Sequence, residues 1–468
     1  MTHPGSSSVA HSLETLLLCS EKAATLARLI RTHSLFDTLI QRKCAHEANA
    51  RFDIDLKTLA DVLIQEGIRY DLEKMFPNLG SSVHGEENNS FQNSFGEVIS
   101  LSITDPVNQL TNTLEDILTG DRALARSLSQ VVLRPLDSFR THTAVQSAIS
   151  GTRTTSLNDV RLDLSLCELW VDPIDATAEY AEGVPVRSSD SFMITDFIDQ
   201  QHSLAPCILR YIPGTLANVT VLIGVFDRIS GIPFLGVVNQ PFYLPSDSEC
   251  SDTDTSFHSG RLFWGFRSPD FTSPTTSPCQ IPVSSTSVYR QVSFDCPLED
   301  VRTDALLRVA CSYPEVHRLE RIFQSWSPNS RMSPTVVLLS SPGAGFKLMC
   351  LCRAEIDIYL LLLPSAYFWD TCAPHAILRS LSPDGGGLIR LSIAVAAVRQ
   401  MLTDSHPESS ELISSISSRL TEFQVVYTPK QPNRDLAEYR HSDGLLAYRN
   451  GQLASRLLIF LAIALPSA

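Results

Sequence analysis

The sequence predicts an α+β lobe followed by an α/β lobe. Two amphipathic helical patterns and a β-hairpin indicate the first lobe, and strands that alternate with helical runs indicate the second. Between them, residues 245–259 and 268–286 are rich in Ser, Thr, Asp and Pro, a composition typical of exposed loops. We therefore place the first lobe at 1–270 and the second at 271–468.

Two helices are predicted near the start of the first lobe. Residues 9–33 carry apolar side chains at spacings of three and four, among them Leu13 and Leu16. The same spacing runs over 56–75, where Asp61 lies beside the apolar stripe. An acid in that position usually lies at the rim of the apolar face, unless another carboxylate or a metal is near.

Short strands complete the first lobe. They are predicted at 98–103, at 167–171, and in a hairpin of 219–226 with 234–239, whose connection contains Gly231.

In the second lobe we expect a strand at 335–339, a helical run at 346–352 and a strand at 356–363. Asp370 then marks a strand-to-helix junction, where a helix N-cap is the default interpretation. The apolar residues 457–465 are predicted to form a buried terminal helix.

Composition restricts the class of protein. The 468 residues are 43% hydrophobic and carry a net charge of -14, which argues against a nucleic-acid partner because polyanion binding needs a basic face. Eleven cysteines without framework spacing indicate reduced thiols. No secretion signal is visible, and the nine apolar residues near the C-terminus are far fewer than the roughly 20 that cross a bilayer. We predict a cytoplasmic protein without a membrane span.

The segment Asp172-Pro173-Ile174-Asp175 is the strongest chemical signal in the chain. Its two carboxylates and the Ile174 carbonyl are hard oxygen ligands of the kind Mg²⁺ prefers, and Pro173 stiffens the backbone between them. Thr177 follows where its hydroxyl can orient a water. Ordinary turn chemistry remains the alternative interpretation of this segment.

Two further acidic segments strengthen the prediction of a metal site. Glu86 and Glu87 follow Gly85, which lets the backbone approach a ligand closely, and Asp370 stands alone before an apolar run. Acids from distant parts of the chain that converge on one point are expected at a site holding several Mg²⁺ ions. Taken alone, Glu86 and Glu87 are more typical of a solvated turn.

The segment Gly343-Ala344-Gly345-Phe346-Lys347 has two interpretations. It is either a plain turn or a glycine loop that opens a helix, whose free N–H groups suit a phosphate.

Together these segments resemble the inositol polyphosphate 1-phosphatases, within the inositol monophosphatase superfamily. The resemblance spans nearly the whole chain, in the family's order, through residues 55–63, 85–87, 170–177, 219–243, 343–347, 369–379 and 444–449. It implies a layered αβαβα sandwich with the site between two lobes, in a monomer that acts on a small inositol phosphate.

The resemblance also implies roles for single residues. The metal ligands, for two or three Mg²⁺ ions, would be Asp61, Glu86, Asp172, the Ile174 carbonyl, Asp175 and Asp370. Glu87 would lie behind them, Asp61 and Glu86 would be candidate general bases, and Thr177 would hydrogen-bond the attacking water. Substrate contacts would come from Ala176, Thr177, Ser312, Gly343 and Lys347. Lithium would inhibit by competing for a Mg²⁺ position.

Two departures from the family pattern affect the phosphate contacts. Ala176 replaces a serine, which removes one hydroxyl and about 1 kcal/mol of hydrogen bonding. Pro314 replaces a lysine two residues after Ser312, and His317 or Arg318 would have to substitute for that cation. These departures suggest a catalytically weakened inositol-phosphate-binding protein as one alternative. Within the superfamily, the other alternative is a 3'(2'),5'-bisphosphate nucleotidase.

Overall fold

The computed structural model describes most of the chain. The described residues are 6–43, 55–104, 106–150, 157–185, 207–243, 260–268, 279–280, 290–293, 306–326, 335–381, 386–403, 406–407, 409–431 and 435–466. The polar loop predicted at 245–259, and nearly all of the one at 268–286, lie outside these residues.

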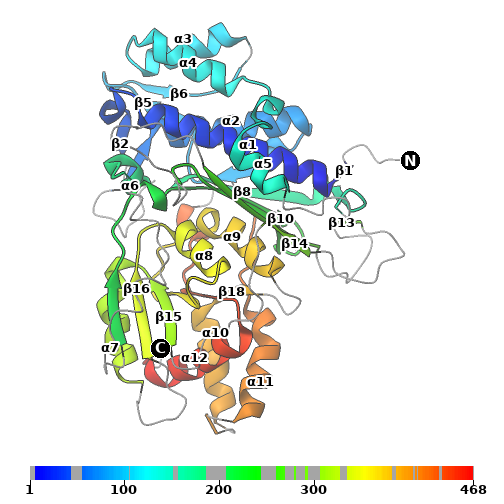
Figure 1. Ribbon diagram of the computed structural model, residues 1–468, viewed down its shortest axis with the longest axis vertical. Helices are drawn as coiled ribbons and strands as arrows, with labels where there is room; N and C mark the ends of the chain where they lie inside the picture. Colours follow the sequence, from blue (N-terminus) through cyan, green and yellow to red (C-terminus); the bar gives the residue numbers. More distant parts are fainter. Residues whose placement is uncertain are drawn as a thin grey trace.

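Two six-stranded sheets form the framework (Figure 1). The first has the order β14-β12-β11-β10-β8-β4 and is antiparallel except between β4 and β8. Its strands are β4 (Val83–Gly85), β8 (Cys167–Asp175), β10 (Thr220–Asp227), β11 (Pro233–Gln240), β12 (Arg261–Arg267) and β14 (Arg290–Val292). The predicted hairpin is confirmed as β10 and β11.

The second sheet has the order β18-β19-β17-β15-β16-β9. Strands β9, β16, β15 and β17 are parallel, and β19 is antiparallel to both of its neighbours. These strands are β9 (Cys207–Tyr211), β15 (Leu306–Cys311), β16 (Thr335–Ser340), β17 (Ile358–Leu361), β18 (Gly387–Arg390) and β19 (Leu445–Tyr448).

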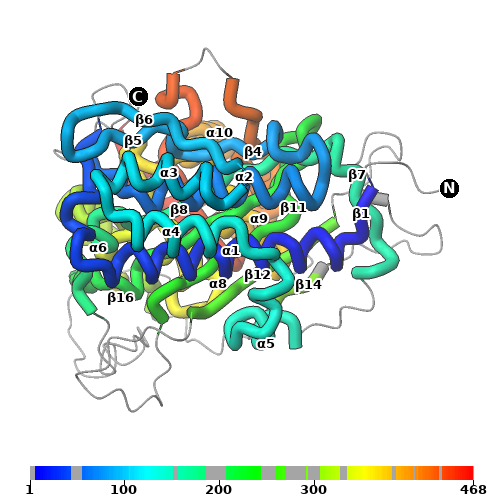
Figure 2. The backbone as a smooth tube through the Cα atoms, turned by 90° about the horizontal axis from the view of Figure 1, so that it is seen from above, coloured from blue at the N-terminus to red at the C-terminus, as the bar shows by residue number. Residues whose placement is uncertain are grey.

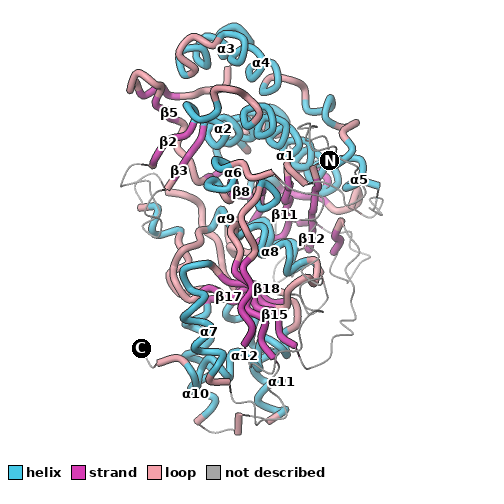
Figure 3. Tube along the Cα trace, turned by 60° about the vertical axis from the view of Figure 1, so that its left-hand side comes forward, coloured by secondary structure: helices cyan, strands magenta, loops and turns pink. Residues whose placement is uncertain are grey.

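Helices on both sides of each sheet complete an α/β sandwich, as predicted. Helices α1 (Val9–Arg31) and α2 (Leu59–Met75) lie side by side across the outer face of the first sheet (Figure 2). Helices α8 (Ala344–Cys352) and α9 (Phe368–Ser380) lie between the two sheets (Figure 3). The far face of the second sheet packs on α7 (Val316–Gln324), α10 (Leu391–Leu402), α11 (Ser410–Arg419) and α12 (Gly451–Ala464).

A row of glycines brings α9 unusually close to the first sheet. Gly224, Gly236 and Gly265 are cross-strand neighbours on β10, β11 and β12. A Cβ atom on Gly236 would lie 2.1 Å from the Ala373 carbonyl oxygen, and one on Gly224 would lie 2.5 Å from the Ala373 nitrogen. Because side chains are absent from this row, α9 can pack directly on the strands from Cys372 onward.

The smaller elements surround this sandwich. Helices α3 (Val107–Ile117) and α4 (Arg122–Val132) form the outermost layer (Figure 1), with α5 (Thr143–Ser150) near α1 and α6 (Thr177–Glu182) after β8. The minor sheets are β1 (Ser6–Ser8) with β7 (Arg161–Asp163) and β13 (Cys279–Gln280), β2 (Ile40–Arg42) with β3 (Leu56–Thr58), and β5 (Ser90–Gln92) with β6 (Val98–Ser100). None of the helices in the described part combines the length and apolar composition needed to cross a bilayer.

Several element boundaries differ from those expected. Residues 56–58 form β3, so the helix begins at Leu59, and the helix predicted from 346 begins at Ala344. The strand predicted to end at Val171 continues to Asp175. The two sheets also exchange strands across the predicted boundary at residue 270, because β9 joins the second sheet and β14 joins the first. The division into 1–270 and 271–468 stays a prediction.

A buried histidine between the two sheets is expected to make the fold sensitive to acid. His375 on α9 is completely buried, with Nε2 2.8 Å from Gln424 Oε1 and Nδ1 3.1 Å from the Tyr427 hydroxyl. Burial lowers its pKa from 6.5 to about 3. Because the unfolded chain binds the proton more readily, His375 stabilises the fold fully above pH 6.5, and this contribution falls as the pH drops. At pH 5 the loss is about 2 kcal/mol.

We therefore expect His375→Gln to flatten the fall in free energy of unfolding between pH 7.5 and pH 5, measured by urea denaturation. The matched control is His317→Gln on α7, because His317 is exposed. The same slope in wild type and His375→Gln would contradict a neutral buried imidazole.

Candidate active site

A β-bulge turns the two carboxylates of the Asp-Pro segment to one face of the first sheet. In β8, Asp172 pairs with Leu222 and Asp175 pairs with Thr220, so that two residues, Pro173 and Ile174, oppose one on β10. Side chains three apart on a regular strand point to opposite faces, whereas the extra bulged residue brings them to the same face. Pro173 has no N–H to donate and is tolerated at a bulge. The segment is thus the irregular end of a strand and not a turn.

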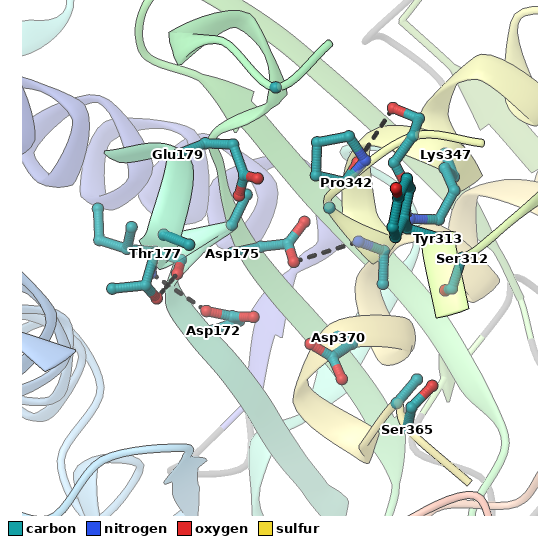
Figure 4. A pocket seen from close by; sticks show the side chains of 18 of the residues that line it. Asp172, Asp175, Thr177, Glu179, Ser312, Tyr313, Pro342, Lys347, Ser365 and Asp370 are labelled. Carbon is teal, nitrogen blue, oxygen red and sulfur yellow. Dashed lines mark hydrogen bonds between the residues drawn. The ribbon is translucent and has the colours of Figure 1, made fainter. Parts of the chain in front are cut away.

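Asp370 completes an acidic group with these two residues. One carboxylate oxygen from each of Asp172, Asp175 and Asp370 lies within 4.8 Å of the others. Figure 4 shows the three side chains directed toward a common space. Asp370 is the third residue of α9 and not its N-cap, and its Oδ2 accepts a hydrogen bond from the Tyr367 nitrogen at 2.5 Å.

The start of α8 is occupied by Asp175. The Gly345 nitrogen donates to Asp175 Oδ2 at 2.8 Å, and the Ala344 nitrogen donates to Oδ1 at 3.3 Å. Thr220 Oγ1 donates to the same Oδ2 at 3.1 Å. The glycine loop therefore holds a protein carboxylate, and the expectation that its N–H groups are free for a phosphate is wrong for these two groups. A Cβ on Gly345 would lie 2.9 Å from Asp175 Oδ2.

Glu86 reaches the same cavity from the end of β4. It lines the cavity, and Lys43 forms an ion pair with it and another with Glu87 Oε1 at 2.5 Å. Burial raises the pKa of Glu86 to about 7, against the lowering effect of Lys43. Neither acid lies in a solvated turn, and a Cβ on Gly85 would meet the Gln65 side chain.

Asp61 is completely buried behind this cavity and does not line it. Its Oδ2 accepts hydrogen bonds from the Thr58 nitrogen and hydroxyl, both at 2.6 Å, at the start of α2. Its Oδ1 is buried and has no hydrogen-bond partner among the residues placed by the structure. Burial, followed by the charge of Glu87, raises the pKa of Asp61 to about 8.

The electrostatics of the acidic group fit a divalent cation. Burial raises the pKa of Asp172 and Asp370 well above the usual value, and the neighbouring carboxylates raise it further. The three clustered aspartates and Glu86 repel one another, and Asp61 has a buried oxygen without a hydrogen-bond partner among the described residues, so added positive charge would stabilise the site. The donor set is made of oxygens, which is the ligand type of Mg²⁺, Mn²⁺ and Ca²⁺.

Thr177 and Ala176 follow the bulge directly. The Thr177 hydroxyl donates to the Ile174 carbonyl oxygen at 2.9 Å, and all three residues line the cavity. Ala176 has φ 66°, the left-handed conformation that glycine adopts most easily.

Ala176→Gly is expected to raise the free energy of unfolding by roughly 0.5 to 1 kcal/mol, because the left-handed strain of alanine is removed. Thermal unfolding at matched metal concentration measures the change. The control is Ala123→Gly near the start of α4, where glycine should destabilise the helix. A lower stability for Ala176→Gly would contradict the left-handed conformation of residue 176 in solution.

The remaining predicted substrate contacts line one cavity of about 700 Å³ with the carboxylates. Ser312, Gly343 and Lys347 are all on its wall, and Lys347 Nζ donates to the Ser341 carbonyl oxygen at 2.7 Å. His317 and Arg318 are exposed on α7 and do not line this cavity, so they do not replace the missing cation there.

Sequence reasoning missed several residues of the site, five of which matter for its charge and its exposed wall. Lys43 pairs with the glutamates, and Asp55, Glu179, Tyr211 and Tyr313 line the cavity. Of these, Asp55 had a usable signal, because it begins the segment 55–63 that carries part of the family resemblance. Tyr313 also had one, because it lies between Ser312 and Pro314. The positions of Lys43, Glu179 and Tyr211 depend on contacts between segments far apart in the chain.

Comparison with known proteins agrees with this geometry. The model of the inositol monophosphatase family matches residues 66–388. The inositol polyphosphate 1-phosphatase of Homo sapiens is 28% identical over 452 residues, which cover 96% of each chain. The enzyme of the same name from Mus musculus is 31% identical over 80% of this chain and 81% of its own.

A more distant similarity concerns the nucleotidases. The 3'(2'),5'-bisphosphate nucleotidase 1 of Mus musculus is 25% identical over 46% of this chain and 47% of its own. Since the family model covers more than half of the sequence and the acids converge on one cavity, the chain belongs to the inositol monophosphatase family of phosphatases.

Proposed function

We propose that the protein is a Mg²⁺-dependent phosphomonoesterase that removes the 1-phosphate from inositol 1,4-bisphosphate and inositol 1,3,4-trisphosphate. The observation that carries the proposal is the group of Asp172, Asp175 and Asp370 in the cavity that also contains Thr177. The names of two relatives that match 80% or more of this chain support an inositol phosphate as substrate.

The residues that would hold the metal are Asp172, Asp175, Asp370, Glu86 and the Ile174 carbonyl. Bound Mg²⁺ would supply a water of lowered pKa and neutralise charge on the phosphate and on the leaving oxygen. The chain's contribution is to fix the ligands: the α8 amides hold Asp175, and the Tyr367 amide holds Asp370.

Thr177 would orient the attacking water. Its hydroxyl proton is already donated to Ile174, so its oxygen can accept a hydrogen bond from that water. Glu86 lines the cavity with a pKa of about 7 and would accept the water's proton. Asp61 does not line the cavity. Its buried Oδ1, which has no hydrogen-bond partner among the described residues, would support the metal site from behind the cavity wall. The backbone N–H groups of Ala176 and Thr177 would hold the scissile phosphate.

The test is phosphate release from inositol 1,4-bisphosphate and from 3'-phosphoadenosine 5'-phosphate, each with Mg²⁺ and with or without Li⁺. We expect faster release from the inositol substrate and inhibition by Li⁺. Faster release from the nucleotide would keep the metal chemistry and replace the substrate by that of a bisphosphate nucleotidase, the alternative supported by the nucleotidase similarity. Binding without release would indicate a weakened binding protein, for which Ala176 and Pro314 are the candidate causes.

We also propose a monomer in the cytoplasm. Seven cysteines in the described segments are free and buried, as expected for reduced thiols. Equilibrium sedimentation and fractionation test these two points.

A further inference from the structure

Two tyrosines form an exposed wall of the cavity. Tyr211 is the last residue of β9, and Tyr313 follows the end of β15 by two residues. Strand β16 lies between these strands and is parallel to both, so their carboxyl ends meet at one edge of the second sheet, where α/β folds bind ligands. The two ring centroids are 5.6 Å apart with an interplanar angle of 52°.

The exposure of these rings is high for aromatic residues. Tyr211 is 48% exposed and Tyr313 is 70% exposed, and both line the cavity that contains the three aspartates. A ring that enters the cavity can therefore cover apolar surface that water now contacts, which favours binding.

The two tyrosines of this wall carry no charge. Among the cavity-lining residues that the structure describes, Lys347 is the one cation, and it is buried with its Nζ on the Ser341 carbonyl. Glu179 lines the same cavity as an acid, and Figure 4 shows Thr177 and Glu179 on one side of Asp175 with Tyr313 and Lys347 on the other. The wall therefore offers aromatic surface to the ring of a substrate and no charge to its phosphates.

We infer that Tyr211 and Tyr313 form a ring-binding platform that selects phosphate esters by a ring face, either the C–H face of a cyclitol or the π face of a base. The inference deepens the proposed phosphatase function and rests on it. The platform binds the ring, while the acidic group faces the scissile phosphate. Loss of a platform tyrosine therefore raises KM and leaves kcat nearly unchanged.

The experiment measures kcat and KM for three phosphate esters. Inositol 1,4-bisphosphate carries a cyclitol, 3'-phosphoadenosine 5'-phosphate carries a base, and glycerol 2-phosphate carries no ring. The variants are Tyr313→Ala, Tyr211→Ala and Tyr313→Phe, with Ile229→Ala as control because Ile229 is 61% exposed in the β10–β11 hairpin, away from the cavity lining.

We expect the two alanine variants to raise KM for a ring substrate by about five- to tenfold, in line with the loss of one stacking contact. KM for glycerol 2-phosphate should stay unchanged, and Ile229→Ala should behave as wild type. Tyr313→Phe keeps the aromatic ring, so it should recover most of the affinity for ring substrates that Tyr313→Ala loses. The ring substrate whose KM rises more shows whether the platform binds a cyclitol or a base. Equal changes for all three esters, or none, would overturn the inference.

Failure of the proposed function is distinguishable from failure of the platform. If wild type releases phosphate from none of the esters, titration calorimetry with the two ring compounds and with inorganic phosphate still tests the platform. Tyr313→Ala must then weaken binding of a ring compound by about fivefold or more and leave inorganic phosphate unaffected. Unchanged binding of both ring compounds would overturn the platform independently of catalysis.

Discussion

Asp172→Asn is expected to abolish metal-dependent turnover, with a fall in kcat of at least about 1,000-fold. Asp172 is 1% exposed and contributes one of three clustered carboxylates, so asparagine removes a buried charge with little change in volume. The metal-free variant should be more stable than metal-free wild type, because the remaining acids repel one another less. Both quantities are measurable on one preparation, by initial rates and by thermal unfolding in chelator.

The control for this variant is Asp159→Asn, because Asp159 is exposed and does not line the cavity. It should leave turnover and metal-free stability unchanged. Retained turnover in Asp172→Asn would refute the assignment of this residue. A large fall in stability would show that Asp172 acts mainly in folding.

Gly345→Ala is the second change with a large expected effect. A Cβ at this position would lie 2.5 Å from Thr220 Oγ1 and 2.9 Å from Asp175 Oδ2, so the Asp175 carboxylate must move. Displacement of a positioned catalytic group by about 1 Å lowers turnover by on the order of 100-fold. We expect that loss in kcat together with a higher metal concentration for half-maximal activity.

Gly67→Ala is the matched control for the glycine variant. Gly67 lies within α2, and a methyl group added there would meet no atom of the described residues within 4 Å. Alanine should therefore stabilise the helix by up to about 1 kcal/mol. Normal activity in Gly345→Ala would mean that Asp175 can shift without consequence for the metal site.

The sequence was informative where one local pattern decides the structure. The apolar spacing in 9–33 predicts α1, and the two runs around Gly231 predict the β10–β11 hairpin, since both patterns arise from neighbours in the chain. The acidic residues were also recognisable, because oxygen ligands next to proline and glycine are chemically distinctive.

Features that depend on distant segments were not predictable in the same way. The bulge at Pro173 is defined by its pairing with β10, and the position of Asp370 depends on the glycine row beneath α9. Nothing near Lys43 in the chain indicates that its ammonium meets Glu86 and Glu87. Strand β9 joins the second sheet and β14 joins the first, because strand pairing and not chain order determines the sheet to which each belongs.

The most direct test of a metal-dependent phosphatase is phosphate release from inositol 1,4-bisphosphate by protein stripped with EDTA and then titrated with Mg²⁺, with Asp172→Asn measured in parallel. The structure predicts negligible release without metal, recovery of turnover with Mg²⁺ in wild type, and no recovery in Asp172→Asn. Equal release by stripped and Mg²⁺-loaded wild type would contradict metal-dependent catalysis at this site.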